Sequence, residues 1–461
     1  MKFKRIKKLH FVGIGGTGMC GIAEVLFNLG YSISGSDLKK TEVTQHLESL
    51  GININYFHKE ENIKDADVVV YSSAIKPDNP ELIVATAKKI PIIPRAEMLA
   101  ELMKLKFSIA VAGTHGKTTT TSLIGHVLSK CGFDPTVIVG GRVLGVGTNA
   151  YLGKGDYVVA EADEFDRSLL RFYPTMAIIT SIEPEHMECY DSIDDLYNCF
   201  VEFASRVPFY GSIIYCLDDS GLQQVRERFT RPSISYGFSR HADLHAGELS
   251  YSSGGISFVC YSNNNTLGRV RVPLYGKHNV LNSLAVLAVA LDLEIPFEKA
   301  TSALASFPGV SRRMELVGQV DGVKVYDDFA HHPTEIKITL EGVRNSFTGR
   351  IVVVFQPHLY SRTKTFYKEF GSSFFDSDML IVTDIYPSRE RPIQNVTGEL
   401  VAEAAKKSGH KQVEYIKDKS KIAGFLKEKL KAGDLVLVMG AGDIYHLSPQ
   451  IIKEIEVGKR R

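Results

Sequence analysis

The stretch Ala112–Thr120, with the sequence AGTHGKTTT, constrains the fold of this chain more than any other segment. A short apolar segment, Ser108–Val111, precedes it, and Thr119–Lys130 carries apolar residues at helical spacing. In the order strand, loop and helix, glycines let backbone N–H groups approach phosphates, and the helix N-terminus adds a favourable dipole. The stretch therefore predicts a phosphate-binding loop in an α/β sheet, with a nucleoside triphosphate as its ligand.

The residues at the end of this loop have separate expected roles. Lys117 is expected to reach the β- and γ-phosphates, and the hydroxyl of Thr118 is expected to bind Mg²⁺. The longer form of the loop has a glycine five residues before Gly116, where this chain has Val111. The loop is thus a shortened form, and the alternative is a tight glycine turn that only connects core elements.

Composition narrows the class of protein. At 461 residues the chain is long enough for about three domains. Its 54 Lys and Arg balance 53 Asp and Glu, which argues against a nucleic-acid-binding protein. No apolar run reaches the roughly 18 residues of a membrane span, so we expect no membrane partner. The six cysteines form no CxxC pair, which favours a reducing compartment, and we expect a cytoplasmic protein.

Three regions of the chain differ in their pattern. Up to residue 106, short apolar segments alternate with helical stretches, which predicts a doubly wound parallel sheet. Residues 107–313 hold the phosphate loop, and turn residues within 249–273 predict added antiparallel hairpins. Residues 314–461 again alternate strand and helix. We therefore predict an α/β fold of three domains, 1–106, 107–313 and 314–461. The first and third are expected to be Rossmann-like, and the second is expected to resemble the P-loop ATPases.

A second glycine motif, Gly13–Gly18, follows the first expected strand and precedes a helix. Such a turn holds a pyrophosphate at a helix N-terminus, and Asp37 stands about 20 residues on, like the acid that binds a ribose hydroxyl. The alternatives are an NAD-type dinucleotide, the nucleotide handle of a substrate, and a turn that serves packing alone. Two different phosphate motifs in one chain favour two nucleotides of different kinds.

Acidic residues and a histidine follow two further expected strands. Glu161 comes directly after Tyr157–Ala160, and Glu185 and His186 come soon after Ala177–Thr180. The carboxyl ends of such strands face the ligand crevice, and Mg²⁺ prefers oxygen ligands. Glu161 is therefore the expected metal ligand and His186 an assisting one. The alternative is a surface acid and a capping histidine.

Eight motifs, taken in order, resemble a known family. They are HFVGIGGTGM (His10–Met19), AGTHGKTTT (Ala112–Thr120), EADEFD (Glu161–Asp166), EPEHM (Glu183–Met187), GKHNVLN (Gly276–Asn282), GVSRRME (Gly309–Glu315), DDFAHHPTE (Asp327–Glu335) and FQPHLYSRT (Phe355–Thr363). Over essentially its whole length the chain resembles the Mur ligases, and among them those that join L-alanine to UDP-N-acetylmuramate in peptidoglycan synthesis. The resemblance implies an ATP-dependent ligase that forms an acyl phosphate on the lactyl carboxylate.

The resemblance also implies a set of site residues. The UDP substrate is expected on Gly15, Gly16, Thr17 and Gly18, with Asp37, Ser72, Ser73 and Arg95 as further contacts. ATP is expected on Gly113, Thr114, His115, Gly116, Lys117, Thr118 and Thr119, with Asn279 and Asn282 at the adenine and Asp328 at the ribose. Thr118 and Glu161 are expected at one Mg²⁺ and His186 near a second. The alternative role of the two asparagines is to cap a helix.

The expected catalytic residues come from all of these motifs. Lys117, His186 and Arg313 are expected to act on the phosphates, and His358 and Arg362 on L-alanine, with His331 beside them. Arg362 would pair with the alanine carboxylate as a planar fork. His331, His332 and His358 are alternative bases for the amine.

Three positions depart from the pattern common in the family. Phe329 stands where tyrosine is common, and Ser181 where asparagine is frequent. Some relatives carry a carbamylated lysine after the metal histidine, but Asp194–Ser205 contains no lysine. Charge at a second Mg²⁺ would then come from elsewhere.

The sequence leaves several functions open. A recycling ligase that joins UDP-N-acetylmuramate to a peptide would share the nucleotide motifs. Alternatives from other classes are a dinucleotide-dependent oxidoreductase and a P-loop switch protein. The expected partners are small molecules only, and the expected state is a monomer or homodimer.

Overall fold

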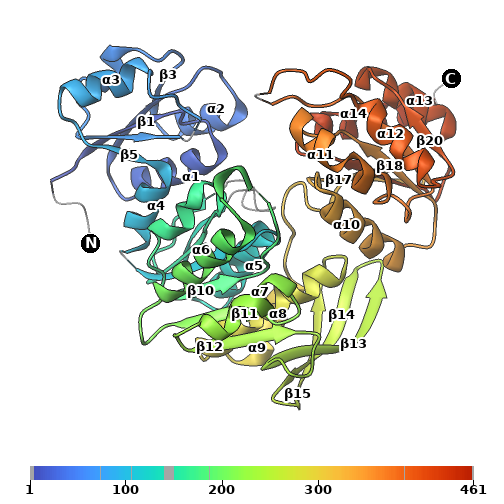
Figure 1. Cartoon of the computed structure of the whole chain (residues 1–461), viewed down its shortest axis with the longest axis horizontal. Helices are drawn as coiled ribbons and strands as arrows, with labels where there is room; N and C mark the ends of the chain where they lie inside the picture. Colours follow the sequence, from blue (N-terminus) through green and yellow to red (C-terminus); the bar gives the residue numbers. More distant parts are fainter. Residues whose placement is uncertain are drawn as a thin grey trace. The chain divides into compact units, whose positions relative to one another are not determined.

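The computed structural model describes residues 5–72, 74–104, 106–139, 150–185, 187–388 and 390–458 (Figure 1). Within these residues the strands form three sheets of five, ten and six strands. The chain divides into two compact units. One holds the chain up to Glu248 with Phe258–Arg271 and Leu281–Pro308, and the other holds Leu249–Ser257, Val272–Val280 and the chain from Gly309 onward. The three sheets with their helices confirm the predicted three-domain α/β fold.

The N-terminal sheet is parallel, in the order β3-β2-β1-β4-β5. Its strands are β1 (Lys8–Val12), β2 (Ser32–Ser36), β3 (Asn53–Asn55), β4 (Val68–Tyr71) and β5 (Ile92–Pro94). Its helices are α1 (Thr17–Asn28), α2 (Glu42–Ser49), α3 (Pro80–Ala87), α4 (Arg95–Met103) and the 3₁₀ turn η1 (Glu60–Ile63). The strand order reverses at β1, so the loop after β1 lies at the point where open α/β sheets bind ligands.

The central sheet has the order β15-β14-β13-β12-β11-β10-β6-β9-β7-β8. Its strands are β6 (Phe107–Ala112), β7 (Thr136–Ile138), β8 (Ala150–Tyr151), β9 (Tyr157–Glu161), β10 (Met176–Ile179), β11 (Ser212–Cys216), β12 (Ser233–Gly237), β13 (Leu244–Ser252), β14 (Gly255–Ser262) and β15 (Asn265–Val272). The strands from β7 to β13 through β9, β6, β10, β11 and β12 pair in parallel, and β8 joins β7 antiparallel. At the predicted turn, Asn263 and Asn264 take positive φ angles of 47° and 65°, as a two-residue hairpin requires.

The helices of the same region flank these strands. They are α5 (Lys117–Lys130), α6 (Ile193–Ser205), α7 (Ser220–Val225), α8 (Lys277–Asp292) and α9 (Phe297–Ala305), with the 3₁₀ turns η2 (Phe165–Arg171), η3 (Met187–Cys189) and η4 (Arg226–Arg228). Helix α5 begins at Lys117, two residues before the predicted start. Gly116 is its N-cap, with a left-handed φ of 81° that ends the loop.

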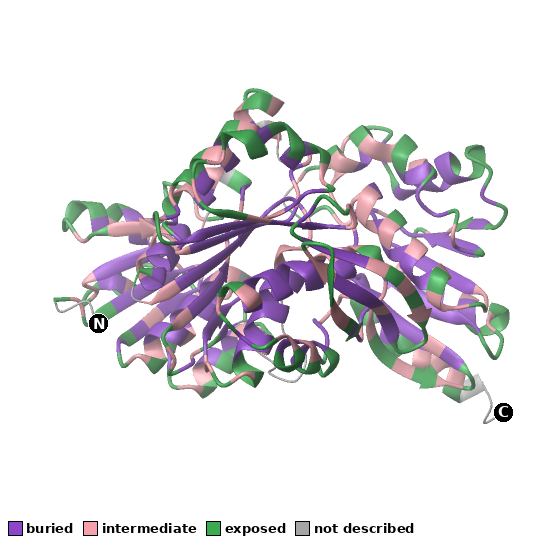
Figure 2. Cartoon of the chain, turned by 90° about the horizontal axis from the view of Figure 1, so that it is seen from below, coloured by how far each residue is buried: buried purple, intermediate pink, exposed green. Residues whose placement is uncertain are grey.

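The C-terminal sheet has the order β16-β17-β21-β18-β19-β20 and is parallel except for the pair β16 and β17. Its strands are β16 (Glu315–Val320), β17 (Val323–Asp328), β18 (Ile351–Phe355), β19 (Met379–Val382), β20 (Val413–Tyr415) and β21 (Leu435–Met439). Its helices are α10 (Pro333–Ser346), α11 (Tyr360–Gly371), α12 (Gly398–Lys407), α13 (Ile422–Lys429) and α14 (Leu447–Gly458), with η5 (Lys419–Lys421) and η6 (Ile444–His446). Every residue of β18, β19 and β21 is buried, as in parallel strands that are covered on both faces. Figure 2 shows how the buried residues gather on strands.

Within the described chain, no helix is both long and apolar enough to cross a membrane.

A buried polar network lies beneath the glycine turn of the N-terminal domain. The Glu81 carboxylate, which is fully buried, accepts hydrogen bonds from the Ser36 hydroxyl (2.7 Å) and the Asn62 amide (2.5 Å). His58 Nδ1 lies 3.1 Å from Glu81 Oε2, and His10 Nε2 lies 3.6 Å from Glu81 Oε1. Burial alone would raise the pKa of Glu81, but the neighbouring His10 ring and the hydrogen bonds from Ser36 and Asn62 lower it below its ordinary value of 4.5. The network holds a charge inside the domain by surrounding it with donors.

We expect Glu81→Ala to destabilise the protein by about 3 kcal/mol, because it leaves several buried donors without their acceptor. Urea unfolding at pH 7 measures this loss, with exposed Glu61→Ala as the control. Because the folded-state pKa of Glu81 is lowered, its contribution is present above pH 4.5 and shrinks as the pH falls through the folded-state value. Equal stability of Glu81→Ala and wild type would contradict the account.

Candidate active site

The glycine turn between β1 and α1 is fixed by the two strands beside it. Gly13 and Ile14 donate backbone hydrogen bonds of 2.8 and 3.1 Å to the carbonyl of Ser36. Gly15 N donates to Asp37 Oδ2 at 2.9 Å, and Leu38 N donates to Asp37 Oδ1 at 2.8 Å. Asp37 thus braces the turn, and its contact with a substrate ribose stays a prediction.

Several predicted substrate residues converge on this turn. A Cβ on Gly15 would lie 2.9 Å from Asp37 Oδ2, and one on Gly18 would lie 2.7 Å from Arg95 Nη1. Ser72 Cβ would lie 3.3 Å from a Cβ on Gly13. The turn therefore needs glycine at these positions, because side chains of the predicted substrate-binding residues lie too close to its backbone for a Cβ atom. Gly16 is the N-cap of α1. The side chain of Thr17 and all of Ser73 lie outside the described residues.

The phosphate loop connects β6 to α5, as predicted. Gly113 has φ 128°, and a Cβ there would overlap the Thr180 hydroxyl. Gly116 has φ 81°, and a Cβ there would lie 2.7 Å from Asn282 Oδ1. Both glycines are required because of conformation and space together. Thr118 and Thr119 lie in the first turn of α5.

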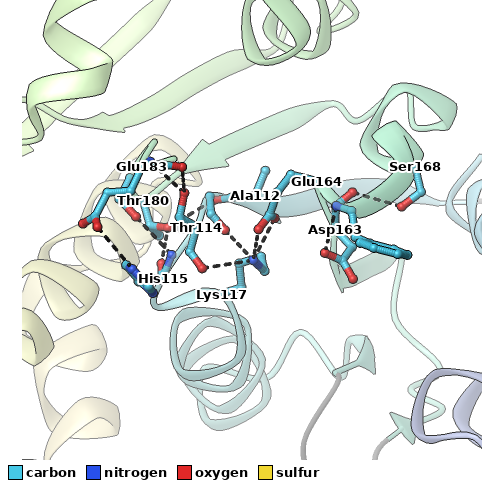
Figure 3. A network of polar contacts seen from close by, with 12 residues as sticks. Ala112, Thr114, His115, Lys117, Asp163, Glu164, Ser168, Thr180 and Glu183 are labelled. Atoms are coloured by element: carbon cyan, nitrogen blue, oxygen red, sulfur yellow. Dashed lines mark hydrogen bonds and ion pairs between the residues drawn. The ribbon is translucent and has the colours of Figure 1, made fainter. Parts of the chain in front are cut away.

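The segment after β10 holds the loop by hydrogen bonds (Figure 3). Thr114 N donates to the Ser181 carbonyl (3.0 Å), and His115 N donates to Ser181 Oγ (3.1 Å). Glu183 N donates to the Thr114 hydroxyl at 2.8 Å, and the Thr180 hydroxyl donates to the His115 carbonyl at 2.5 Å. The unusual Ser181 therefore contributes a side-chain acceptor to the loop.

The ammonium group of Lys117 is surrounded by oxygen atoms (Figure 3). It donates to the carbonyls of Gly113 (2.5 Å) and Thr114 (3.2 Å) and to both carboxylate oxygens of Glu164 (2.8 and 3.0 Å). Burial alone would lower the pKa of Lys117, but the carboxylates of Glu164 and Asp163 raise it well above its ordinary value. Lys117 is therefore charged and directed into the loop. Glu164 was not among the predicted site residues, although it lies in the EADEFD motif.

Glu161 lies beside the phosphate loop, at the end of β9. It is in register with Val111 of the neighbouring strand β6, and Thr118 stands in the first turn of the helix that follows the loop. These oxygen donors fit Mg²⁺, which is held in proteins by one or two carboxylates together with phosphates. Among the described residues no cluster of three His, Cys, Asp or Glu is suited to a metal, and such a site does not need one. His186, the predicted second ligand, lies outside the described residues.

The two asparagines of α8 make contacts within the protein. Asn282 Oδ1 accepts a hydrogen bond from the Thr120 hydroxyl (3.2 Å) and packs on Gly116, so this side chain supports the phosphate loop. Asn279 Nδ2 donates to the Tyr275 carbonyl (2.7 Å). Their contact with adenine stays a prediction.

Asp328, predicted at the ribose, is buried at the end of β17. Its two carboxylate oxygens accept hydrogen bonds of 2.8 Å from the backbone N–H groups of Met314 and Ala330. Asp328 thereby fixes the segments that carry Arg313 and the paired histidines. A ribose contact would add to this structural role.

Glu335 connects Arg313 with His331. Its Oε1 lies 3.7 Å from Arg313 Nη1, and its Oε2 lies 3.3 Å from His331 Nδ1. Oε2 also accepts backbone hydrogen bonds from His331 (3.1 Å) and His332 (3.3 Å). Glu335 was not among the predicted site residues. The signal was its position three residues after the N-cap His332, where a capping box places Glu.

The three candidate bases have different surroundings. His332 Nδ1 accepts the capping hydrogen bond from Thr334 N (3.4 Å). His331 and His358 meet edge to face, with ring centroids 5.9 Å apart. His358 stacks on Tyr386, and Arg362 Nη1 lies 3.4 Å from its Nδ1. The structure thus brings together His331, His358 and Arg362, the predicted L-alanine residues.

Phe329, which stands where tyrosine is common in the family, has no hydroxyl, and its ring contacts two arginines. The guanidinium carbons of Arg312 and Arg313 lie 4.9 and 5.3 Å from its ring centroid. Cation–π attraction therefore helps to hold Arg313. Leu359, next to His358, has φ 70°, a strained value for leucine of the kind found near functional sites.

Comparisons with known proteins identify the family of this chain. Models of the Mur ligase family match residues 8–107 (catalytic domain), 111–290 (middle domain) and 312–442 (glutamate ligase domain). The chain is 48% identical over 458 residues to the UDP-N-acetylmuramate–L-alanine ligase of Geobacter sp. strain M21, with 99% of each chain covered. The chain belongs to the Mur ligase family, and it is a ligase.

Solved structures agree with this assignment. The UDP-N-acetylmuramate–alanine ligase of Thermotoga maritima superposes with a TM-score of 0.84 at 29% identity, covering 98% of this chain and 99% of that one. A murein peptide ligase from Psychrobacter arcticus gives 0.71 at 24% identity, covering 97% and 98%. The second likeness shows the shared fold alone.

The surroundings of His358 lead to a prediction about its protonation. Burial lowers the pKa of His358 to about 4, and His331 and Arg362 act in the same direction. In the unfolded chain its pKa is near 6.5, so stability is lost as the pH falls from 6.5 towards 4. We expect ¹⁵N NMR of histidine-labelled protein to show a neutral ring at pH 5.5, with the signal assigned from His358→Gln. A titration midpoint near 6.5 would contradict this.

Proposed function

We propose that the chain joins L-alanine to the lactyl carboxylate of UDP-N-acetylmuramate and converts ATP to ADP and phosphate. The observation that carries the proposal is the pairing of Lys117 with the buried Glu164 in a braced phosphate loop, in a chain that resembles ligases of this name over nearly its full length. The reaction belongs to peptidoglycan synthesis, and we place it in the cytoplasm. The partners are the two small-molecule substrates, and the protein acts as a monomer or homodimer.

The two glycine motifs divide the nucleotides between them. The turn after β1 takes the pyrophosphate of the UDP substrate, with Arg95 approaching the turn at Gly18. The loop after β6 takes the triphosphate of ATP. Within the proposed domains 1–106, 107–313 and 314–461, the first thus holds the acceptor and the second the phosphoryl donor.

The first chemical step makes the carboxylate reactive. A lactyl carboxylate oxygen attacks the γ-phosphorus of ATP, and the bond between this phosphorus and the β,γ-bridging oxygen breaks. ADP leaves, and an acyl phosphate remains. Lys117 and Arg313 counter the negative charge that gathers as the two anions meet. Mg²⁺, held by Thr118 and Glu161 with His186 near a second ion, would supply further charge neutralisation.

The second step forms the amide bond. The amine of L-alanine attacks the acyl carbon, and the tetrahedral intermediate collapses with release of phosphate. Arg362 binds the alanine carboxylate. We assign His331 as the base, because the Glu335 carboxylate beside Nδ1 stabilises an imidazolium, whereas His332 uses Nδ1 in a helix cap.

Phosphate release with different acceptors separates the proposed function from its rivals. We expect release from ATP only when both UDP-N-acetylmuramate and L-alanine are present, with glycine and L-serine tested beside them. Release that depends on a tripeptide and not on L-alanine would favour the recycling ligase. A change in reduced-cofactor absorbance without ATP hydrolysis would favour the oxidoreductase.

We expect Lys117→Ala to lower kcat by at least about 1000-fold, because it removes a preorganised cation from the transferring phosphoryl group. Binding of UDP-N-acetylmuramate, measured by calorimetry, should change less than about 3-fold, since it uses the other glycine turn. Lys130→Ala, at the exposed end of α5, is the control. Equal loss of both functions would mean that the nucleotides are assigned to the wrong domains.

A further inference from the structure

The hydrogen bonds of Lys117 leave little capacity for a phosphate. A lysine ammonium group has three N–H donors. In this loop they face the carbonyls of Gly113 and Thr114 and the two oxygens of Glu164, at 2.5 to 3.2 Å. A phosphate oxygen that approaches Lys117 must therefore displace a protein oxygen or share a donor with it.

The backbone keeps Glu164 in place. Its side chain is 2% exposed, and its carbonyl accepts hydrogen bonds from the Tyr190 hydroxyl (2.5 Å) and Arg167 N (3.0 Å). It stands directly before η2 (Phe165–Arg171). Because the side chain is buried and its backbone is held, a change of rotamer does not bring the Glu164 carboxylate into water. We therefore expect it to stay near Lys117.

We propose that Glu164 is a positioning residue that occupies Lys117 in the nucleotide-free enzyme and competes with the nucleotide phosphates for it. The proposal rests on the proposed function, because it takes the loop to be the ATP site. Glu164 directs the ammonium group of Lys117 into the loop before ATP arrives. Because the same pairing must be broken or shared when ATP binds, it lowers the affinity for the nucleotide.

The sign of this effect distinguishes competition from a purely structural role. If phosphates take Lys117 from Glu164, a buried carboxylate loses its partner; if they share it, two anions come close. Both arrangements oppose binding, so neutralising Glu164 tightens it. If Glu164 only supported the fold, neutralising it would leave binding unchanged or weaken it.

The test compares wild type with Glu164→Gln. We expect calorimetry with ADP, both with and without Mg²⁺, to give a Kd lower by at least about 5-fold, the lower range of energetic coupling between sites. The melting temperature of the nucleotide-free variant should fall, because Lys117 loses its buried counter-ion. Asp434→Asn is the matched control, since Asp434 is buried and pairs with Arg350 at 3.1 Å in the C-terminal domain. It should lower the melting temperature and leave the Kd for ADP unchanged.

Three outcomes overturn the proposal. An unchanged or higher Kd for Glu164→Gln without Mg²⁺ excludes competition, and weaker binding only with Mg²⁺ assigns Glu164 to the metal instead. If wild type does not bind ADP at all, the proposed function itself fails. Should Glu164→Gln not fold, Glu164→Asp withdraws the carboxylate by one methylene. The proposal then requires a Kd for ADP below that of wild type.

Discussion

The backbone contacts between the phosphate loop and the end of β10 are the constraint on which the nucleotide site depends. Gly113 has no room for a side chain because the Thr180 hydroxyl lies against it, and Ser181 holds Thr114 and His115 through one carbonyl and one hydroxyl. These contacts set the curvature of the loop, and the curved loop directs the ammonium group of Lys117 towards the loop carbonyls. The loop is therefore shaped by a neighbouring strand as much as by its own glycines.

Two cations of the proposed mechanism are each held by a glutamate within their own unit. Lys117 pairs with Glu164, and Arg313 pairs with Glu335 while its guanidinium lies over the Phe329 ring. Oriented charges in a site of low water content counter developing negative charge better than mobile ones, because they need little reorganisation. The same pairs prevent two cations from standing unpaired before the substrates arrive.

The sequence predicted the features that local pattern controls. The order of strand, glycine loop and helix was predicted, and the structure has Gly113 and Gly116 in the loop between β6 and α5, with Lys117 at the start of the helix. Apolar runs located the buried strands. Contacts between distant segments were not predictable, because periodicity carries no information on them. Glu164 was therefore missed, because its contact with Lys117 joins positions 47 residues apart. Glu335 had a local signal in its capping-box position after His332, but its pairing with Arg313 could not be predicted from that signal. Asp37 accepts a hydrogen bond from Gly15 in the turn after β1, a contact that sequence pattern also does not give. Helix α5 starts earlier than predicted because the left-handed Gly116, not a polar cap, ends the loop.

In the proposed reaction the chain activates a carboxylate through phosphoryl transfer before the amine attacks. Oxygen-18 labelling tests it most directly. UDP-N-acetylmuramate with ¹⁸O in both lactyl carboxylate oxygens is incubated with unlabelled ATP and L-alanine, and the released phosphate is analysed by mass spectrometry. We expect one ¹⁸O atom in each phosphate, because the bridging oxygen of the acyl phosphate leaves the acyl carbon with the phosphate. Phosphate without the label, formed together with the amide product, would contradict an acyl phosphate and with it the account.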